Sequence, residues 1–209
     1  ENARNLQVFV FHGDEDDAVN VVASRKMMEA FEKAGLAGKS VHYFELPGVT
    51  HFAWDFAYRD AALFRRVADV RRDPFPERVV YSTFSPRYSK AYWLRIDRID
   101  RGLALARIEG TQTAGAFDVK TDNLAAFSIL LAPAIAPAGK PIEVKVNGKS
   151  AFRGVPKGEV LSFAGGKASW KRTDPWKGPA QGPPDHAEAS FRNATLAQYG
   201  PHVYAYGTL

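Results

Sequence analysis

Two short apolar runs, each followed by a turn that carries a potential catalytic side chain, constrain this chain most. The first run, residues 8–11, ends at His12-Gly13, and the second, residues 40–46, ends shortly before His51. A continuously apolar run is typical of a strand covered on both faces in a parallel sheet. Apolar residues at helical spacing over residues 21–34 predict a helix between the runs. We therefore predict a strand–helix–strand crossover.

A second helical pattern follows and closes the first predicted domain. It covers residues 56–70 and is stopped by Pro74. Residues 71–78 are charged and interrupted by prolines, as linkers commonly are. Residues 1–74 thus predict an α/β domain with the order βαβα, which is part of a larger sheet.

Beyond residue 78 the apolar spacing changes from helical to alternating. Asn147-Gly148 separates two strand-like runs and is a preferred sequence for a two-residue hairpin, and Gly165-Gly166 is a second hairpin signal. No helical pattern interrupts residues 79–171, so we expect an all-β domain here, an Ig-like β-sandwich. The strand-like runs are residues 79–84, 91–96, 103–108, 116–121, 125–130, 142–146, 150–152, 160–163 and 168–170.

The last predicted region, residues 172–209, begins with a segment rich in proline and glycine that we expect to be an extended linker. A short helical pattern at residues 191–199 and a strand-like run at residues 202–208 predict the start of a further element. A strand in that position also predicts that the native polypeptide continues.

Composition limits the class of protein to which this chain can belong. The chain is 45% hydrophobic and 24% charged, as in ordinary globular proteins, and no apolar run approaches the ~20 residues of a membrane-spanning helix. It contains no cysteine, which excludes disulfides and thiolate metal sites. The net charge is −2 over residues 1–74 and +7 over residues 75–209. Because the basic residues are scattered singly, without an aromatic stacking motif, we expect no nucleic-acid partner.

Asp16 and His51 are the candidate catalytic residues. Each follows a predicted strand of the crossover, and the carboxyl ends of neighbouring parallel strands meet at one edge of a sheet. A carboxylate that holds a histidine which acts as general base completes a triad in the chain order Ser, Asp, His. Asp14 and Asp17 compete with Asp16 for the acid. The alternative is that this acidic cluster is a solvated turn that caps the following helix.

The nucleophile of such a triad is missing from the chain. No Gly-x-Ser-x-Gly occurs in the 209 residues, and the nearest sequence, Gly148-Lys149-Ser150, has Phe152 in place of the second glycine. We assign His12 to the turn and His42 to the second strand, both in structural roles.

A metal centre is the other chemistry that these side chains could support. His12, Asp14, Asp16 and His51 could converge on an ion, but no His-x-His or Glu-x-x-His spacing supports preformed ligation. We therefore predict neither a metal nor a cofactor.

The motif His12-Gly13-x-x-Asp16-x-x-Val19, a helix, and Leu46-Pro47-Gly48-x-x-His51 resembles the end of the catalytic domain of prolyl-oligopeptidase-like serine peptidases and related esterases, which are α/β-hydrolases. The resemblance covers residues 6–70 and implies that Asp16 and His51 are the triad acid and base. Asn20 departs from the proline often found after the Val19 position. The later segments, from Tyr81-Ser82-Thr83 to Tyr206-Gly207-Thr208, resemble the appended β-domain of large bacterial members.

This resemblance implies a function. We expect the chain to be part of a periplasmic or secreted serine hydrolase that cleaves peptide or carboxylic ester bonds, and to be inactive alone. The upstream part of the same protein, or a second copy, would complete the sheet. The alternative is a non-catalytic binding or spacer module of a multidomain bacterial protein, with the β-sandwich as its working part.

Overall fold

The computed structural model describes residues 1–113, 115–166, 168–177 and 180. The chain divides into two compact units, Glu1–Asp73 (unit 1) and Pro74–Leu209 (unit 2), and each is described by itself. Strands dominate the described residues, so the prediction of a β-rich chain is confirmed. The predicted helix at residues 191–199 and strand at residues 202–208 lie outside the described residues.

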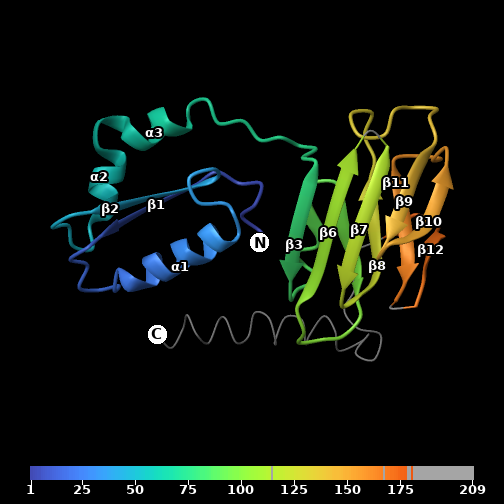
Figure 1. Ribbon diagram of the computed structural model, residues 1–209, viewed down its shortest axis with the longest axis horizontal. Helices are drawn as coiled ribbons and strands as arrows, with labels where there is room; N and C mark the ends of the chain where they lie inside the picture. Colours follow the sequence, from blue (N-terminus) through green and yellow to red (C-terminus); the bar gives the residue numbers. More distant parts are fainter. Residues whose placement is uncertain (114, 167, 178–179, 181–209) are drawn as a thin grey trace. The chain divides into compact units, whose positions relative to one another are not determined.

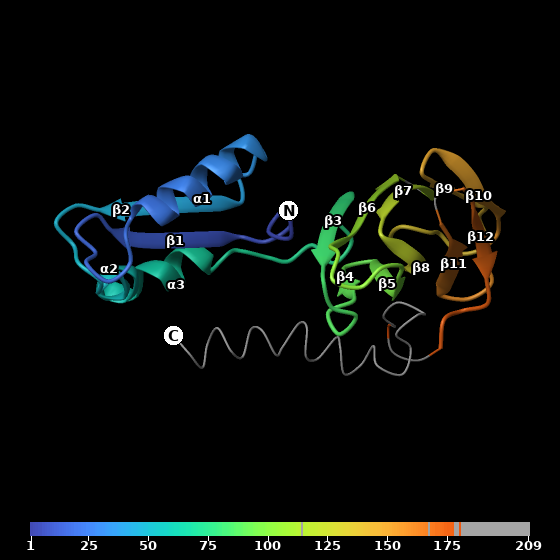
Figure 2. The same cartoon turned by 90° about the horizontal axis from the view of Figure 1, so that it is seen from below.

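Unit 1 is built on two parallel strands. The strands pair in register from Val8 opposite Val41 to Gly13 opposite Leu46. The helix between them lies on one face of the pair, and the helices that follow lie on the other (Figures 1 and 2). The elements are β1 (Val8–Gly13), α1 (Val22–Lys33), β2 (Val41–Leu46), α2 (Ala53–Tyr58), the 3-10 turn η1 (Arg59–Ala61) and α3 (Ala62–Val67).

The prediction of one helix over residues 56–70 is wrong. The helical segment begins at Ala53 and is broken at Asp60 and Ala61, whose φ angles are 49° and 56°. Residues whose backbone lies in the left-handed region, with positive φ, cannot continue a right-handed helix. The Arg65 guanidinium donates to the Asp60 carbonyl, which gives that carbonyl a partner at the break. The apolar spacing continues across the break, so the sequence pattern alone does not reveal it.

A carboxylate on β2 fastens α1 to the sheet. Arg25 Nε on α1 donates to Glu45 Oε2 at 3.0 Å, and the Tyr43 hydroxyl donates to the same oxygen at 2.8 Å. These hydrogen bonds, Arg25 first, lower the pKa of Glu45 to about 2 from its ordinary 4.5. Burial and the neighbouring Glu45 raise the pKa of Tyr43 to about 12.

Acid is expected to release this contact. Since the folded pKa of Glu45 is depressed, its ionised form stabilises unit 1 above pH 4.5, and the contribution is lost as the pH falls toward about 2. In Glu45→Gln, the protection factors of the α1 amides, which correct for the pH dependence of the intrinsic exchange rate, should therefore fall less between pH 4.5 and pH 2 than in wild type. Glu32→Gln, at an exposed position of the same helix, is the control. Identical profiles for wild type and Glu45→Gln would contradict this account.

Unit 2 consists of two five-stranded sheets, in the orders β10-β9-β7-β6-β3 and β12-β11-β8-β5-β4 (Figure 1). Neighbouring strands are antiparallel, except that β7 and β9 are parallel. The strands are β3 (Arg78–Thr83), β4 (Lys90–Ala91), β5 (Leu94–Ile99), β6 (Ala106–Thr113), β7 (Ala116–Asp122), β8 (Leu124–Leu130), β9 (Ile142–Val146), β10 (Lys149–Gly154), β11 (Val160–Gly165) and β12 (Trp170–Thr173).

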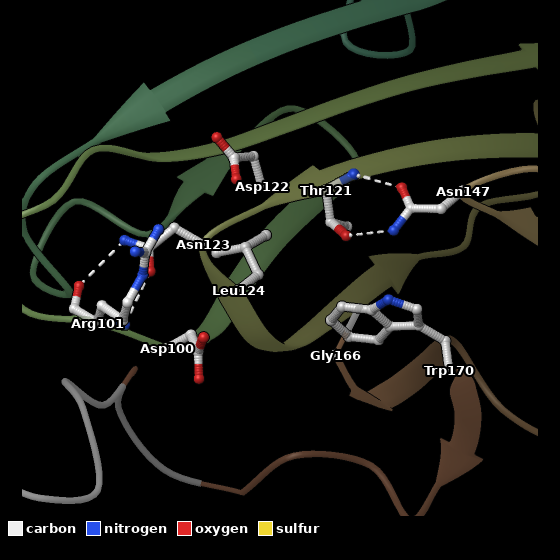
Figure 3. A pocket seen from close by; sticks show the side chains of 9 residues that line it. All are labelled: Asp100, Arg101, Thr121, Asp122, Asn123, Leu124, Asn147, Gly166 and Trp170. Carbon is white, nitrogen blue, oxygen red and sulfur yellow. Dashed lines mark hydrogen bonds between the residues drawn. The ribbon is translucent and has the colours of Figure 1, made fainter. Parts of the chain in front are cut away.

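The structure confirms both predicted hairpins of unit 2, β9–β10 and β11–β12, and corrects the position of the turn in the second. Asn147 and Gly148 have φ angles of 50° and 79°, as a type I′ turn requires, and join β9 to β10 (Figure 3). Gly165, by contrast, is not in a turn, because it pairs with Trp170 inside the β11–β12 ladder. A Cβ on Gly165 would lie 2.2 Å from the Ser169 carbonyl oxygen. Close approach of the backbones therefore explains this glycine.

The predicted strand at residues 103–108 is also displaced. β6 begins only at Ala106, and Leu103 lies in a turn with a φ of 58° and 79% of its surface exposed. The alternation of apolar residues continues into this turn without being buried, which explains the error.

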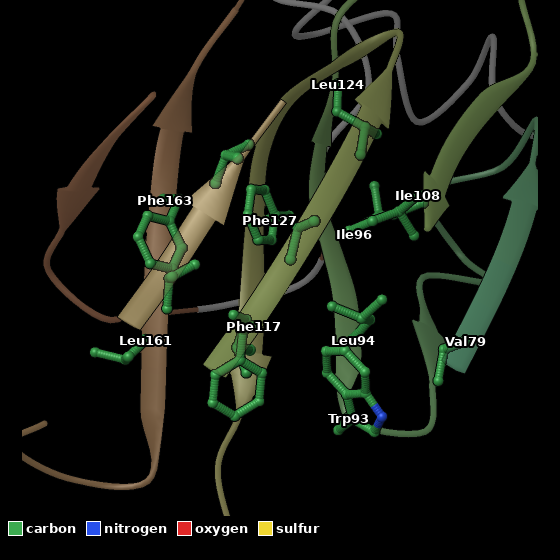
Figure 4. Packing of buried hydrophobic residues seen from close by; sticks show 14 of the residues in the cluster. Val79, Trp93, Leu94, Ile96, Ile108, Phe117, Leu124, Phe127, Leu161 and Phe163 are labelled. Atoms are coloured by element: carbon green, nitrogen blue, oxygen red, sulfur yellow. The ribbon is translucent and has the colours of Figure 1, made fainter. Parts of the chain in front are cut away.

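The two sheets of unit 2 share one hydrophobic core. Phe117 and Ile108 on one sheet and Phe127 and Phe163 on the other are almost completely buried in a single cluster (Figure 4). The Phe127 and Phe163 rings stack with centroids 5.2 Å apart. Buried residues alternate with more exposed ones along β6 and β7, as in two sheets packed face to face, whereas six consecutive residues of β8 are buried.

The opposite face of the second sheet carries a buried polar network. Asp97 is fully buried and accepts a hydrogen bond from Arg95 Nε at 2.6 Å and another from the Ser128 hydroxyl. Ser128 Oγ also lies 2.7 Å from Ser162 Oγ, and Ser162 Oγ accepts from the Trp176 backbone N–H at 2.9 Å. Burial raises the pKa of Asp97, although Ser128 and Arg95 oppose this shift. The network joins β5, β8 and β11 to the segment that follows β12.

Candidate active site

The turn after β1 places the Asp16 side chain. Asp16 Oδ1 accepts hydrogen bonds from the backbone N–H groups of Ala18 at 2.9 Å and Val19 at 2.8 Å, and only 5% of the side chain is exposed. An aspartate that bonds the backbone two residues ahead is a common turn-former. The same carboxylate therefore shapes its own loop.

Gly13 lets the loops that follow β1 and β2 approach each other. A Cβ at this position would lie 1.9 Å from the Val49 carbonyl oxygen, so only glycine fits. The Glu15 N–H donates to the Val49 carbonyl at 3.1 Å, and Asp14 Oδ1 accepts from the Gly48 N–H at 2.7 Å. These contacts hold the loop that carries His51 against the turn that carries Asp16.

Asp16 and His51 are in direct contact. Both carboxylate oxygens of Asp16 lie 3.1 Å from His51 Nδ1, within the hydrogen-bonding range of about 2.6–3.2 Å that a catalytic pair requires. A carboxylate can only accept, so Nδ1 carries the proton and donates. Nε2 is then the nitrogen that can accept a proton, and 42% of the His51 side chain is exposed.

The environment of Asp16 favours its ionised form. The backbone N–H of Val19, followed by His51 and the N–H of Ala18, lowers the pKa of Asp16 below its ordinary value of 3.8, and burial only partly opposes this shift. Asp16 is therefore a carboxylate at neutral pH. A buried carboxylate of this kind orients a histidine and stabilises its charged form.

The competing acids have other contacts. Asp14 accepts from the Gly48 N–H, and the exposed Asp17 has no contact with His51 in the described part of the chain. His42 lies on β2, stacked on Phe9 with ring centroids 4.9 Å apart.

His12, which the sequence analysis assigned to the turn alone, lies with its Nε2 3.2 Å from Asp16 Oδ2. Its spacing of four residues from Asp16 was the only signal of this contact.

A largely apolar groove of about 390 Å³ adjoins His51. The edge-on ring pair of His51 and Trp54 has centroids 5.4 Å apart. Among the described residues that line the groove there is no serine, threonine or cysteine. The pair can therefore activate a nucleophile that reaches the groove from elsewhere. The lining residues are Phe9, Phe11, His12, Asp16, Val19, His51, Ala53, Trp54, Ala57, Tyr58 and Leu63.

Two further features are absent from the described ranges. Within them, no group of three or more histidine and carboxylate side chains is arranged to hold a metal ion. No helix there is long and apolar enough to cross a membrane.

Unit 2 has a smaller hollow of about 200 Å³ where several of its turns meet (Figure 3). Asn123 donates to the carbonyls of Arg101 and Ala104, both at 3.0 Å, and Asn147 bonds Thr121 through both ends of its amide. These amides hold the turns in place. The hollow is lined by Asp100, Arg101, Thr121, Asp122, Asn123, Leu124, Asn147, Gly166 and Trp170, a set without a histidine.

Comparison with known proteins finds no matching family model, curated protein or solved structure.

Proposed function

We propose that unit 1 supplies the acid and the base of a Ser-Asp-His triad in a hydrolase that cleaves peptide or carboxylic ester bonds. The observation that carries this proposal is the contact between the buried Asp16 carboxylate and His51 Nδ1, at 3.1 Å beside an open groove. This contact leaves His51 Nε2 as the group that exchanges protons with the nucleophile and the leaving group.

In this mechanism His51 Nε2 removes the hydroxyl proton of a serine as its oxygen attacks the carbonyl carbon of the substrate. Asp16 stabilises the imidazolium that forms. His51 then gives the proton to the leaving amine or alcohol as the scissile bond breaks and an acyl-enzyme remains. Water, deprotonated by His51, attacks the carbonyl carbon of the acyl-enzyme, and His51 returns the proton to the serine oxygen as the acyl–oxygen bond breaks and the acid leaves.

The serine comes, on this proposal, from a polypeptide segment outside the 209 residues. Among the described residues, β1 and β2 pair only with each other, so each keeps an edge at which a further strand can add. An upstream part of the same protein, or a second copy, would complete an α/β-hydrolase sheet there. Unit 2 would be an appended Ig-like domain of a periplasmic or secreted bacterial enzyme.

A second candidate function is a non-catalytic binding or spacer module. It is favoured by the continuous hydrophobic core of unit 2 and by the hollow at its turns. On this alternative the Asp16–His51 contact has no chemical role, and substitutions there leave the function of the protein unchanged.

The proposed roles can be tested first in this chain by ¹⁵N NMR of the histidine rings. We expect neutral His51 to carry its proton on Nδ1. In Asp16→Asn, the carbonyl oxygen of the introduced amide should still accept the hydrogen bonds from the N–H groups of Ala18 and Val19. The amide NH₂ then faces His51 and donates to Nδ1. The proton of His51 should therefore move to Nε2. The His42 signals are the internal control, and a wild-type His51 protonated mainly on Nε2 would contradict the proposal.

A further inference from the structure

A second histidine contacts the carboxylate that holds His51. His12 is the penultimate residue of β1, and only 8% of its surface is exposed. Its Nε2 lies 2.9 Å from the Val19 carbonyl oxygen and 3.2 Å from Asp16 Oδ2. Its Nδ1 lies 2.6 Å from the hydroxyl of Ser24, a buried residue of α1. Two imidazoles therefore flank one carboxylate.

The direction of the hydrogen bonds follows from the partners. The Val19 carbonyl can only accept, so His12 Nε2 carries a proton and donates to it, and the same nitrogen lies 3.2 Å from Asp16 Oδ2. The Ser24 hydroxyl can donate to Nδ1, and this bond keeps the proton of the neutral ring on Nε2. Ser24 and the Val19 carbonyl thus hold the His12 ring with Nε2 3.2 Å from Asp16 Oδ2, while His51 bonds the same carboxylate through Nδ1.

We propose that His12 is a positioning residue for Asp16, and that Ser24 fixes the orientation and the tautomer of His12. This inference rests on the proposed function. Asp16 Oδ1 accepts from two backbone N–H groups, whereas the groups near Oδ2 among the described residues are ring nitrogens, His51 Nδ1 at 3.1 Å and His12 Nε2 at 3.2 Å. His12 thus restrains the Asp16 oxygen that no backbone N–H restrains.

Loss of this restraint should affect catalysis more than substrate binding. His12 contacts Asp16 on the side away from His51 Nε2 and is only one of eleven residues that line the groove, so its replacement should loosen the carboxylate more than it alters the groove. Residues that orient a metal-binding histidine from behind typically contribute about 10–100-fold to affinity or activity, and we expect an effect of the same order for a residue that orients the Asp16 carboxylate. We expect His12→Asn to lower kcat by roughly this factor, with little change in KM.

The variants His12→Gln and His12→Asn distinguish a positioning role of His12 from a role in packing alone. The glutamine amide nitrogen can reach the place of His12 Nε2, and the asparagine amide nitrogen reaches only the place of Nδ1. His12→Gln should therefore retain most of kcat, and His12→Asn should not. Ser24→Ala, which leaves His12 in place without its hydroxyl donor, should cause a smaller loss than His12→Asn.

The experiment combines kinetics with NMR. In the intact hydrolase, which contains this chain and the nucleophile, kcat and KM for p-nitrophenyl acetate are measured for His51→Ala and the variants at His12 and Ser24. In this chain, ¹⁵N spectra should show a lower fraction of His51 protonated on Nδ1 in His12→Asn than in His12→Gln, with the amide signals of α3 unshifted as the control for folding.

The outcomes distinguish the two proposals. If His51→Ala leaves activity intact, the proposed function fails. If His51→Ala abolishes activity while His12→Asn matches wild type, or while His12→Gln and His12→Asn lower kcat equally, the positioning role of His12 is contradicted. If His12→Asn unfolds the chain, Ser24→Ala decides, since an unchanged kcat and His51 tautomer there would overturn the proposal.

Discussion

Replacing His51 by alanine in the hydrolase that we propose contains this chain is expected to lower kcat by roughly 10⁴–10⁶-fold, the loss that follows removal of a triad base. The loss is large because His12, the other described histidine that contacts Asp16 and lines the groove, has its two ring nitrogens engaged by Ser24 and the Val19 carbonyl. Asp16→Asn should lower kcat by about 10⁴-fold, because the asparagine amide stabilises the His51 tautomer that cannot act as the base. Initial rates of ester hydrolysis measure both effects.

The matched control is His42→Ala. His42 stacks on Phe9 and bonds Gln7 Oε1 at 3.3 Å, with no contact to Asp16. Its loss should leave kcat unchanged. A similar loss of activity in His42→Ala and His51→Ala would show that general damage to unit 1, and not the loss of a base, explains both.

Replacing Asp97 by alanine should destabilise unit 2 by about 3 kcal/mol, because removal of one partner from a buried ion pair leaves the other charge uncompensated. Arg95 and Ser128 both donate to Asp97, and the Arg95 side chain is only 24% exposed. The measurement is urea unfolding in a Trp54→Phe background, in which the remaining tryptophans, Trp93, Trp170 and Trp176, all belong to unit 2.

Asp118→Ala is the control for this experiment. Asp118 is an exposed residue of β7, and such substitutions usually change stability by less than about 0.5 kcal/mol. If Asp97→Ala and Asp118→Ala change the free energy of unfolding equally, the network around Asp97 does not stabilise unit 2 as its hydrogen bonds indicate.

Much of the fold could be predicted because hydrophobic periodicity is local. The crossover of unit 1 and the β-rich character of unit 2 follow from apolar spacing, and Asn147-Gly148 marks its hairpin because few residues tolerate two consecutive positive φ angles. The break at Asp60 and the exposed turn at Leu103 were missed, since apolar residues continue through both. The parallel pairing of β7 with β9 depends on contacts between distant residues.

The candidate site was predictable only in part, for a physical reason. Strand ends followed by polar turns indicate which edge of a sheet carries Asp16 and His51, but spacing does not separate Asp16 from Asp14. The structure separates them, because Asp14 bonds the Gly48 N–H and Asp16 faces His51. The contacts of His12 with Ser24 and Asp16 depend on how α1 packs, which a local pattern does not encode.

The measurement that tests the central claim most directly is labelling of the intact protein with a fluorophosphonate, which reacts with activated serines, followed by mapping of the labelled peptide. The 209-residue chain alone should remain unlabelled. The intact protein should be labelled at one serine outside these residues, and His51→Ala should abolish the label. Labelling of a serine within the 209 residues, or labelling that survives His51→Ala, would contradict the assignment of Asp16 and His51 as the acid and base of a serine hydrolase.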